Sequence, residues 1–201
     1  MKKLRLKDVS EAKMSDIFSD ALASNDNKAD FVSDCKRKLE FQTIEFYDTI
    51  GVVLRYIGFS DPRITREGDV NCRMDAIIVD NTSSIPIEIK SPRETMEINI
   101  KSIRQAFENK VVILSRKFHH TTFDTTSLAI AFNYPPIRSD VYELINNIKQ
   151  AFDINIGIIN IDDLLGLVYD CNKNNLVINR EYFNNFAGKF EYEKAFTQTP
   201  Q

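Results

Sequence analysis

A change of hydrophobic period near residue 73 constrains the fold of this chain more than any other feature. Residues 28–58 repeat apolar side chains about every 3.6 positions, which is the pattern of a helix with one buried face. Two short apolar runs follow, at 73–80 and 85–90, and the polar residues 81–84 separate them. Short runs joined by a polar turn predict two strands paired as a hairpin. The chain therefore combines helices with a sheet.

Helices and strands alternate along the rest of the chain. Hydrophobic periodicity predicts helices at 10–22, 97–109, 140–152, 162–169 and 180–186, and strands at 111–114, 127–132 and 154–159. This order predicts the α/β class, with a mixed sheet sandwiched between helices. The polar residues 24–27 separate the first helix from the remainder, so we expect an appendage or linker at 1–27 and a main domain at 28–201.

Composition narrows the class of protein. Of the 201 residues, 43% are hydrophobic, which is enough for a core without disulfides or metals as staples. Three scattered cysteines form neither a disulfide framework nor a zinc motif, and they favour a cytoplasmic protein. No apolar stretch approaches the length of a membrane span, and nothing resembles a signal peptide. A net charge of -3 argues against a general nucleic-acid coat protein.

The residues that can carry chemistry lie in the predicted hairpin. Glu88 and Lys90 are two positions apart on one strand, so their side chains share a face, while Ile87 and Ile89 point to the other. Asp75 lies near the start of the neighbouring strand, and a short turn can bring it beside Glu88. An acid and an amine on one strand face are often only a solvated pair. A second carboxylate at hairpin distance strengthens the case for a site only moderately.

Two converging carboxylates repel each other unless a cation lies between them. Oxygen ligands suit Mg²⁺, which keeps several waters and binds one or two carboxylates together with phosphate oxygens. Such an ion stabilises the charge on a phosphate under attack and lowers the pKa of a bound water. Lys90 then has two open roles, which are to hold or activate the water and to pair with the phosphate.

Five tracts of the sequence resemble a known family in the same order along the chain. They are 39–47, 73–75, 88–90, 155–165 and 176–186, with the sequences LEFQTIEFY, RMD, EIK, NIGIINIDDLL and LVINREYFNNF. Together they resemble the cleavage domains of FokI-like type IIS restriction endonucleases, in the PD-(D/E)XK nuclease superfamily. The tracts 90–94 and 104–109, KSPRE and RQAFEN, are also similar to AlwI-like type II restriction enzymes. The resemblance implies a restriction-endonuclease-like α/β/α sandwich, Mg²⁺ as cofactor and DNA cleavage.

The resemblance also assigns roles to residues of the hairpin. Asp75, Glu88 and Lys90 match the catalytic set, and Asp75, Glu88 and the backbone carbonyl of Ile89 are the expected metal ligands. Three departures leave those ligands in place. Met74 stands where the family has proline, the second acid is glutamate rather than aspartate, and the spacing between the acids is shorter.

Two further residues are candidates to support the site. Many such folds add a glutamate from the first helix, and Glu40, which borders the apolar stripe, is favoured over Glu45 on a more polar flank. Gln105 lies in the next predicted helix, where relatives carry a glutamine, although an exposed helical glutamine is an equal interpretation. His119 and His120 lie in a basic loop, which favours a phosphate contact over catalysis.

Charge patterning favours duplex DNA as the substrate. From residue 90 to residue 120, seven lysines and arginines oppose three acids within an otherwise acidic chain. The basic residues expected to contact the DNA backbone are Arg73, Arg93, Lys101, Arg104, Arg116 and Lys117. No helix-turn-helix, zinc finger or other reader of bases is evident, so recognition is expected in a separate domain or subunit.

One such catalytic set cuts one strand, so cleavage of both strands predicts a transient homodimer, with a related heterodimer as the alternative. The apolar residues that could form the contact, unless the core takes them, are Ile100, Ile103, Phe107, Tyr142, Ile145 and Ile148. Two other functions stay open, a resolvase-like or transposase-like nuclease and a non-cleaving DNA-binding or dimerisation module. The intact set of Asp75, Glu88 and Lys90 favours an endonuclease.

Overall fold

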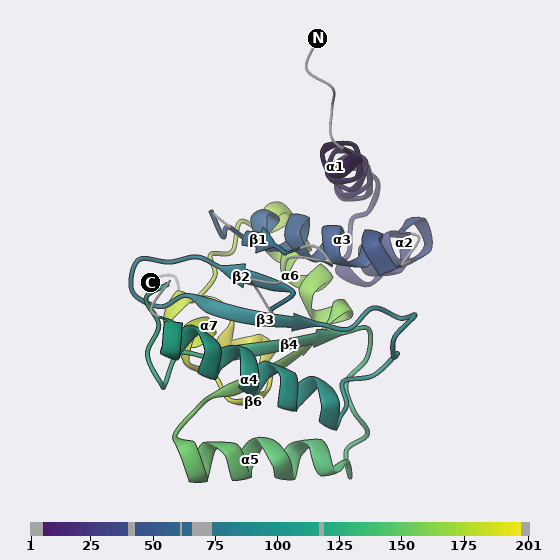
Figure 1. Cartoon of the computed structure of the whole chain (residues 1–201). Helices are drawn as coiled ribbons and strands as arrows, with labels where there is room; N and C mark the ends of the chain where they lie inside the picture. Colours follow the sequence, from purple (N-terminus) through teal and green to yellow (C-terminus); the bar gives the residue numbers. More distant parts are fainter. Residues whose placement is uncertain (1–5, 40–42, 61, 66–73, 117–118, 198–201) are drawn as a thin grey trace.

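The computed structural model describes residues 6–39, 43–60, 62–65, 74–116 and 119–197, and it shows a sheet with helices on both faces (Figure 1). The helices are α1 (Leu6–Ser24), α2 (Lys28–Lys38), α3 (Thr43–Tyr56), α4 (Ile100–Arg116), α5 (Asp140–Phe152), α6 (Ile161–Lys173) and α7 (Arg180–Asn185), with a 3-10 turn at Tyr192–Lys194. The strands are β1 (Pro62–Ile64), β2 (Ala76–Ile78), β3 (Ile85–Ile89), β4 (Ser127–Ala131), β5 (Ile156–Asn160) and β6 (Gly188–Lys189).

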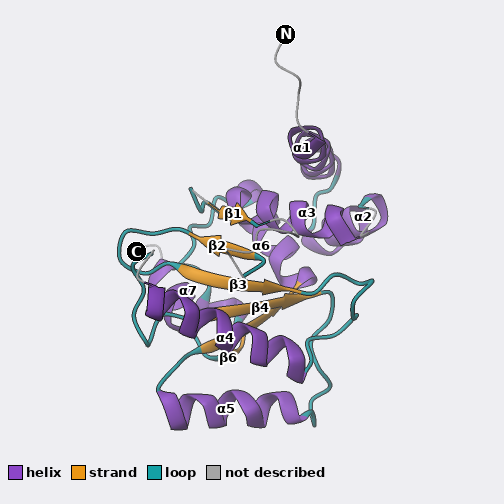
Figure 2. Cartoon of the chain, in the orientation of Figure 1, coloured by secondary structure: helices purple, strands orange, loops and turns teal. Residues whose placement is uncertain are grey.

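The strands lie in the sheet in chain order, from β1 at one side to β6 at the other. β1, β2 and β3 pair antiparallel, whereas β3, β4, β5 and β6 pair parallel. The first two parallel pairings are made by helical crossovers, through α4 and then α5. The carboxyl ends of β3, β4 and β5 therefore lie along one edge of the sheet, and Figure 2 shows β3 and β4 pointing the same way.

Each face of the sheet carries its own core. Ile87, Ile89 and Leu128 point to one face of the sheet and belong to the larger core, which also contains residues of α1, α2, α3 and α6. Ala129 and Ile158 point the other way and pack with α4 and α5. These layers confirm the predicted α/β sandwich around a mixed sheet. Because every residue of β3 is buried, a charged side chain on this strand must find its partners inside the protein.

Short polar side chains fix where four helices begin. Asn27, Ser139, Asn160 and Asn179 each accept a hydrogen bond from a backbone N–H in the first turn of α2, α5, α6 and α7, respectively. Such a cap supplies a partner for a donor that the helix itself leaves unpaired. The predicted starts of the last three helices accordingly agree with the structure to within one residue.

The single long helix predicted over residues 28–58 is wrong in one respect, because the segment forms two helices. α2 ends at Lys38, and Leu39 follows in extended backbone with φ -81° and ψ 114°, while its N–H still bonds to the Cys35 carbonyl. Leu39 and Phe46 are buried in the same core on either side of the break. The apolar period therefore continues past the end of α2, where neither a glycine nor a proline in the sequence marks the break.

The strand predicted at 111–114 is also wrong, because these residues continue α4. Ile103, Ala106 and Ile113 are buried at helical spacing, whereas Val111 is 43% exposed, which alternation along a buried strand would not produce. A run of four apolar residues does not by itself distinguish a strand from a helix. The short strands β1 and β6 were not among the predicted elements, since three and two residues carry no detectable period.

The first helix packs closely on its neighbours. Met14, Phe18 and Ala21 of α1 are buried in the larger core, and the Phe18 ring meets the Tyr56 ring of α3 edge to face. The division of the chain at residue 27 stays a prediction. Among the described residues, no helix combines the length and the apolar character needed to cross a membrane.

Candidate active site at the carboxyl end of β3

Asp75, Glu88 and Lys90 meet at the carboxyl end of β3, as the hairpin predicts. In the β2–β3 pairing Ala76 faces Ile87, so Asp75, one residue earlier, falls beside Glu88. Lys90 directly follows the last residue of β3, and its backbone N–H bonds to the Ile130 carbonyl of β4. The local geometry of the hairpin therefore brings two carboxylates and one amine together.

Glu88 is the most enclosed member of this group, with 2% of its surface exposed. Its Oε1 lies 2.6 Å from Nζ of Lys90, which confirms that the two side chains share a strand face. Its Oε2 accepts a hydrogen bond of 3.0 Å from Nδ2 of Asn109 on α4. Both carboxylate oxygens thus have a donor, which a buried charge requires.

Asp75 has a perturbed acidity. Burial, followed by the negative charge of Glu88, raises its pKa from 3.8 to about 7. The Ile89 N–H, which donates to Oδ2 over 2.8 Å, and the Lys90 ammonium act in the opposite direction without compensating. Two neighbouring acids that repel each other in this way favour the approach of a cation.

The Lys90 side chain keeps its charge although it is almost enclosed. Burial by itself lowers the pKa of Lys90. The hydrogen bond to Glu88 and the nearby charges of Glu88, Glu94 and Asp75 outweigh burial, so its pKa lies above the ordinary value. Lys90 is therefore an ammonium, able to donate to a water or to a phosphate oxygen.

A third carboxylate, Glu94, was not predicted. The turn after β3 places Glu94 so that its Oε2 accepts bonds of 3.0 Å from both N and Oγ of Ser91. Its Oε1 lies 3.7 Å from Nζ of Lys90. Serine followed three residues later by glutamate is a capping pattern, and this spacing was the signal in the sequence that could have located Glu94.

Tyr47, on α3, also contacts the site without having been predicted to do so. Its hydroxyl lies 3.1 Å from the carbonyl oxygen of Ile89 and 3.2 Å from Oε2 of Glu94, so its one proton is shared between them. Burial, then the charges of Asp75 and Glu94, raise the pKa of Tyr47. The hydroxyl thus stays protonated and can donate to the Ile89 carbonyl.

The donors gathered here fit a hard divalent cation. Two carboxylates, on Asp75 and Glu88, and the Ile89 carbonyl are all oxygen donors, and the two carboxylates lie close enough that the charge of Glu88, after burial, raises the pKa of Asp75. The described residues contain no group of three or more His, Cys, Asp or Glu side chains placed to hold a metal. Two carboxylates suffice for Mg²⁺, because this ion retains several waters.

The predicted supporting residues have different outcomes. Glu40, the favoured helix glutamate, lies outside the described residues, and Glu45 is partly buried on α3. Gln105 is partly buried on α4, one turn before Asn109, and its buried Oε1 has no hydrogen-bond partner within the part of the chain that is described. α4 therefore directs two amide side chains, four residues apart, toward the same side.

The predicted phosphate contacts are only partly placed. Arg93, Lys101 and Arg104 are exposed on the turn after β3 and on the first half of α4. Arg73, Lys117 and the side chain of Arg116 lie outside the described residues. The exposed group therefore lies close in sequence to the carboxyl end of β3, where the two acids meet.

The loop after α4 does not belong to this site. The backbone carbonyl of His120 accepts a bond from the Ser84 N–H, which places the histidines at the amino end of β3, opposite Lys90. Lys110, which the count of basic residues included, is completely buried, and its Nζ donates to Oγ1 of Thr121 over 2.8 Å. Burial lowers its pKa to about 7. It cannot contact a phosphate.

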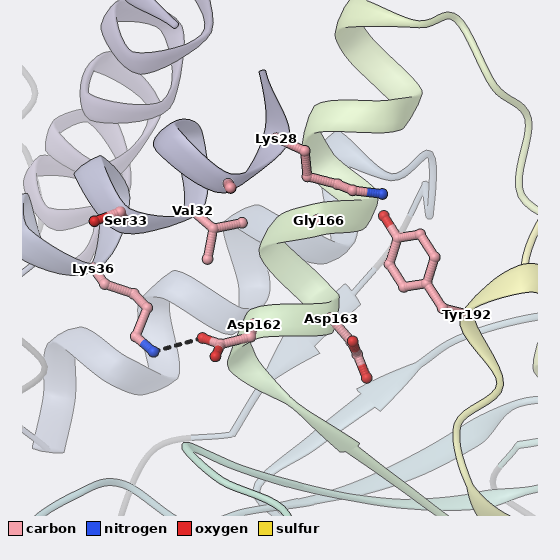
Figure 3. Close-up of a pocket in the computed structure, with 9 residues that line it drawn as sticks. Lys28, Val32, Ser33, Lys36, Asp162, Asp163, Gly166 and Tyr192 are labelled. Carbon is pink, nitrogen blue, oxygen red and sulfur yellow. Dashed lines mark hydrogen bonds and ion pairs between the residues drawn. The ribbon is translucent and has the colours of Figure 1, made fainter. Parts of the chain in front are cut away.

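A hollow lies elsewhere, between α2 and α6 beside Tyr192 (Figure 3). Its volume is about 590 Å³, and no predicted site residue lines it. The two lysines that line it pair across to α6, Lys36 with Asp162 over 2.7 Å and Lys28 with Asp170 over 2.9 Å. These pairs join α2 to α6 beside the hollow.

Comparison with known proteins identifies the fold. No family model matches the sequence, and no curated protein sequence matches it either. Two solved structures are similar: restriction endonuclease FokI (13% identity, TM-score 0.51, 84% of this chain) and restriction endonuclease FokI bound to DNA (11%, 0.48, 94%). The chain spans about one third of their length, 34% of each. The first of these confirms the restriction-endonuclease-like fold that the sequence predicts.

Proposed function

We propose that this chain is a Mg²⁺-dependent endonuclease of the PD-(D/E)XK type that hydrolyses phosphodiester bonds of duplex DNA, and that it is the cleavage domain or subunit of a type II, type IIS-like restriction enzyme. The observation that carries the proposal is the convergence of Asp75, Glu88 and Lys90 at one strand end. It is supported by a fold similar to that of a restriction endonuclease.

Asp75, Glu88 and the carbonyl of Ile89 would hold the metal ion. Bound there, Mg²⁺ supplies a Lewis acid for the phosphate and lowers the pKa of a water. Lys90 donates a hydrogen bond to the attacking water or to a phosphate oxygen and so orients it. Asn109 fixes the carboxylate of Glu88 through Oε2, and Tyr47 fixes the turn that follows β3.

A module that only binds DNA would not need this arrangement. Enclosing the ion pair of Glu88 and Lys90 costs free energy, because both charges lose water. Apolar residues of similar size at these two positions would serve a binding module equally well or better. Retention of the ion pair therefore favours an enzyme over a non-cleaving DNA-binding module.

DNA as the substrate is supported by charge and by position. Arg93, Lys101 and Arg104 present exposed positive charge close in sequence to the acids, as a track for phosphates requires. Because the chain matches only a third of the similar structures, we infer that base recognition belongs to another domain or subunit. Cleavage of both strands then requires two copies of the site, which we propose to be a transient homodimer.

Incubation of supercoiled plasmid with the chain in Mg²⁺ and in EDTA tests the proposed function. Nicked circles are expected in Mg²⁺ and not in EDTA. Glu108→Gln is the matched control, because this acid is exposed on α4 next to Asn109 and its neutralisation leaves the site unchanged. Equal nicking with and without Mg²⁺, or none under either condition, would contradict the proposal.

A further inference from the structure

Lys90 has two carboxylate neighbours that differ in depth. Oε1 of Glu88 is 2.6 Å from Nζ, on a side chain that is 3% exposed. Oε1 of Glu94 is 3.7 Å from the same Nζ, on a side chain that is 39% exposed. One ammonium thus lies between an inner acceptor, which it now contacts, and an outer acceptor at the mouth of the site.

The outer acceptor is held in a fixed orientation. All three hydrogen bonds that Glu94 accepts from Ser91 and Tyr47 end on Oε2. Its other oxygen, Oε1, is the one on the Lys90 side. A carboxylate needed only to close the turn would not have to present this oxygen to an ammonium.

A metal ion bound by Glu88 would compete with Lys90 for the inner acceptor, Oε1 of Glu88. Oε2 of Glu88 is bound to Asn109, so Oε1 is the oxygen best placed to become a ligand. Lys90 occupies that oxygen now. A divalent cation beside Glu88 would repel the ammonium, which then needs another carboxylate within reach.

We propose that Glu94 is a positioning residue for Lys90, which receives the ammonium on Oε1 when a divalent cation takes Oε1 of Glu88. The inference rests on the proposed function, since it presumes that Asp75 and Glu88 bind the metal. The short movement from Glu88 toward Glu94 carries Lys90 outward, to the side from which a phosphate arrives. Glu94 thereby favours metal binding, and the same movement places the Lys90 ammonium for the reaction.

Calorimetric titration of Mg²⁺ into the wild type, Glu94→Gln, Lys90→Ala and the double variant tests the inference without measuring activity. With Lys90 present, Glu94→Gln is expected to raise the dissociation constant of Mg²⁺ about tenfold, as is typical when a partner of a ligand is lost. Without Lys90, the same change should alter it by about twofold or less, because the two residues act as one pair. Glu97→Gln, an exposed acid in the same connection, controls for the loss of one negative charge.

Each outcome bears on one claim. Equal weakening by Glu94→Gln with and without Lys90, or no weakening at all, overturns the role of Glu94 while wild-type binding and plasmid nicking persist. Absence of both Mg²⁺ binding and nicking in the wild type overturns the proposed function itself. If Glu94→Gln does not fold, Glu94→Asp is the second variant, because it keeps the charge but moves the carboxylate away from Lys90 by one methylene. Its effect on Mg²⁺ binding is expected to depend on Lys90 in the same way.

Discussion

The side-chain amide of Asn109 on α4 donates a hydrogen bond of 3.0 Å to the buried carboxylate of Glu88 on β3. This bond crosses from a helix to the sheet and holds one oxygen of a proposed metal ligand. Groups that orient ligands in this way raise metal affinity although they never touch the metal. Asn109 is 3% exposed, so water cannot replace it.

Asn109→Leu, which keeps the volume and removes the donor, should therefore weaken the metal site. The Mg²⁺ concentration for half-maximal plasmid nicking is expected to rise by roughly 10-fold to 100-fold. The free energy of unfolding should fall by about 1–3 kcal/mol, because Oε2 of Glu88 loses its partner. Glu108→Gln on the adjacent position is the control. An unchanged Mg²⁺ requirement in a folded Asn109→Leu protein would contradict the role of Asn109.

Lys110 predicts a dependence of stability on pH. Burial lowers its pKa from 10.5 to about 7, so folding favours the neutral amine. Above the unfolded pKa of 10.5, Lys110 is neutral in both states and its burial costs no stability. As the pH falls from 10.5 toward 7, the unfolded chain takes up a proton on Lys110 that the folded chain does not, so the free energy of unfolding decreases. Lys110→Met should stabilise the protein at pH 7 by on the order of 4 kcal/mol, and this advantage should shrink toward pH 10.

Urea unfolding of Lys110→Met at a series of pH values measures this effect. Lys101→Met, an exposed lysine on the same helix, should show no such dependence. A difference between Lys110→Met and the wild type that stays constant from pH 7 to pH 10 would show that the ammonium is not desolvated.

The exposed basic residues predict how DNA binding responds to salt. Removing one phosphate contact with Arg104→Gln should weaken binding to any duplex sequence and reduce the slope of log K against log salt by about 1. Lys110→Met should leave the slope unchanged, because that lysine is buried. Fluorescence anisotropy at several salt concentrations gives the slopes, and an identical slope for Arg104→Gln and the wild type would exclude Arg104 from the track.

Double-strand cleavage should depend on a second copy of the chain. Ile103, Ile145 and Ile148, considered for the contact, are buried in the core beneath α4 and α5, so they are not available to a partner. Linearisation of plasmid is expected to rise more steeply than linearly with protein concentration, with nicked circles accumulating when the protein is dilute. Strictly first-order linearisation by a species that sediments as a monomer would rule out the homodimer.

The sequence predicts the centre of this site well because the interactions that form it are local. Glu88 and Lys90 share a face by the two-residue repeat of a strand, and the polar turn at 81–84 brings Asp75 alongside. None of these positions depends on how distant elements pack. For the same reason the helices that begin at a polar cap were found at nearly their observed starts.

What the sequence does not predict depends on contacts between distant segments. Asn109 and Tyr47 reach the site from helices that cross opposite faces of the sheet, and no spacing in the chain relates them to Glu88 or Ile89. Lys110 counts as a surface charge until the packing of α4 shows it to be buried. The break after Lys38 is likewise hidden, because both helices face one core.

Nicking of supercoiled plasmid in Mg²⁺ by Asp75→Asn, Glu88→Gln and Lys90→Met, measured beside the wild type, tests the catalytic assignment most directly. Each variant should lose about 1000-fold or more in rate, since each lacks a group that stabilises the transition state. Calorimetry should show Mg²⁺ binding lost in the two acid variants and retained in Lys90→Met. Wild-type nicking by any one of the three folded variants would contradict the assignment.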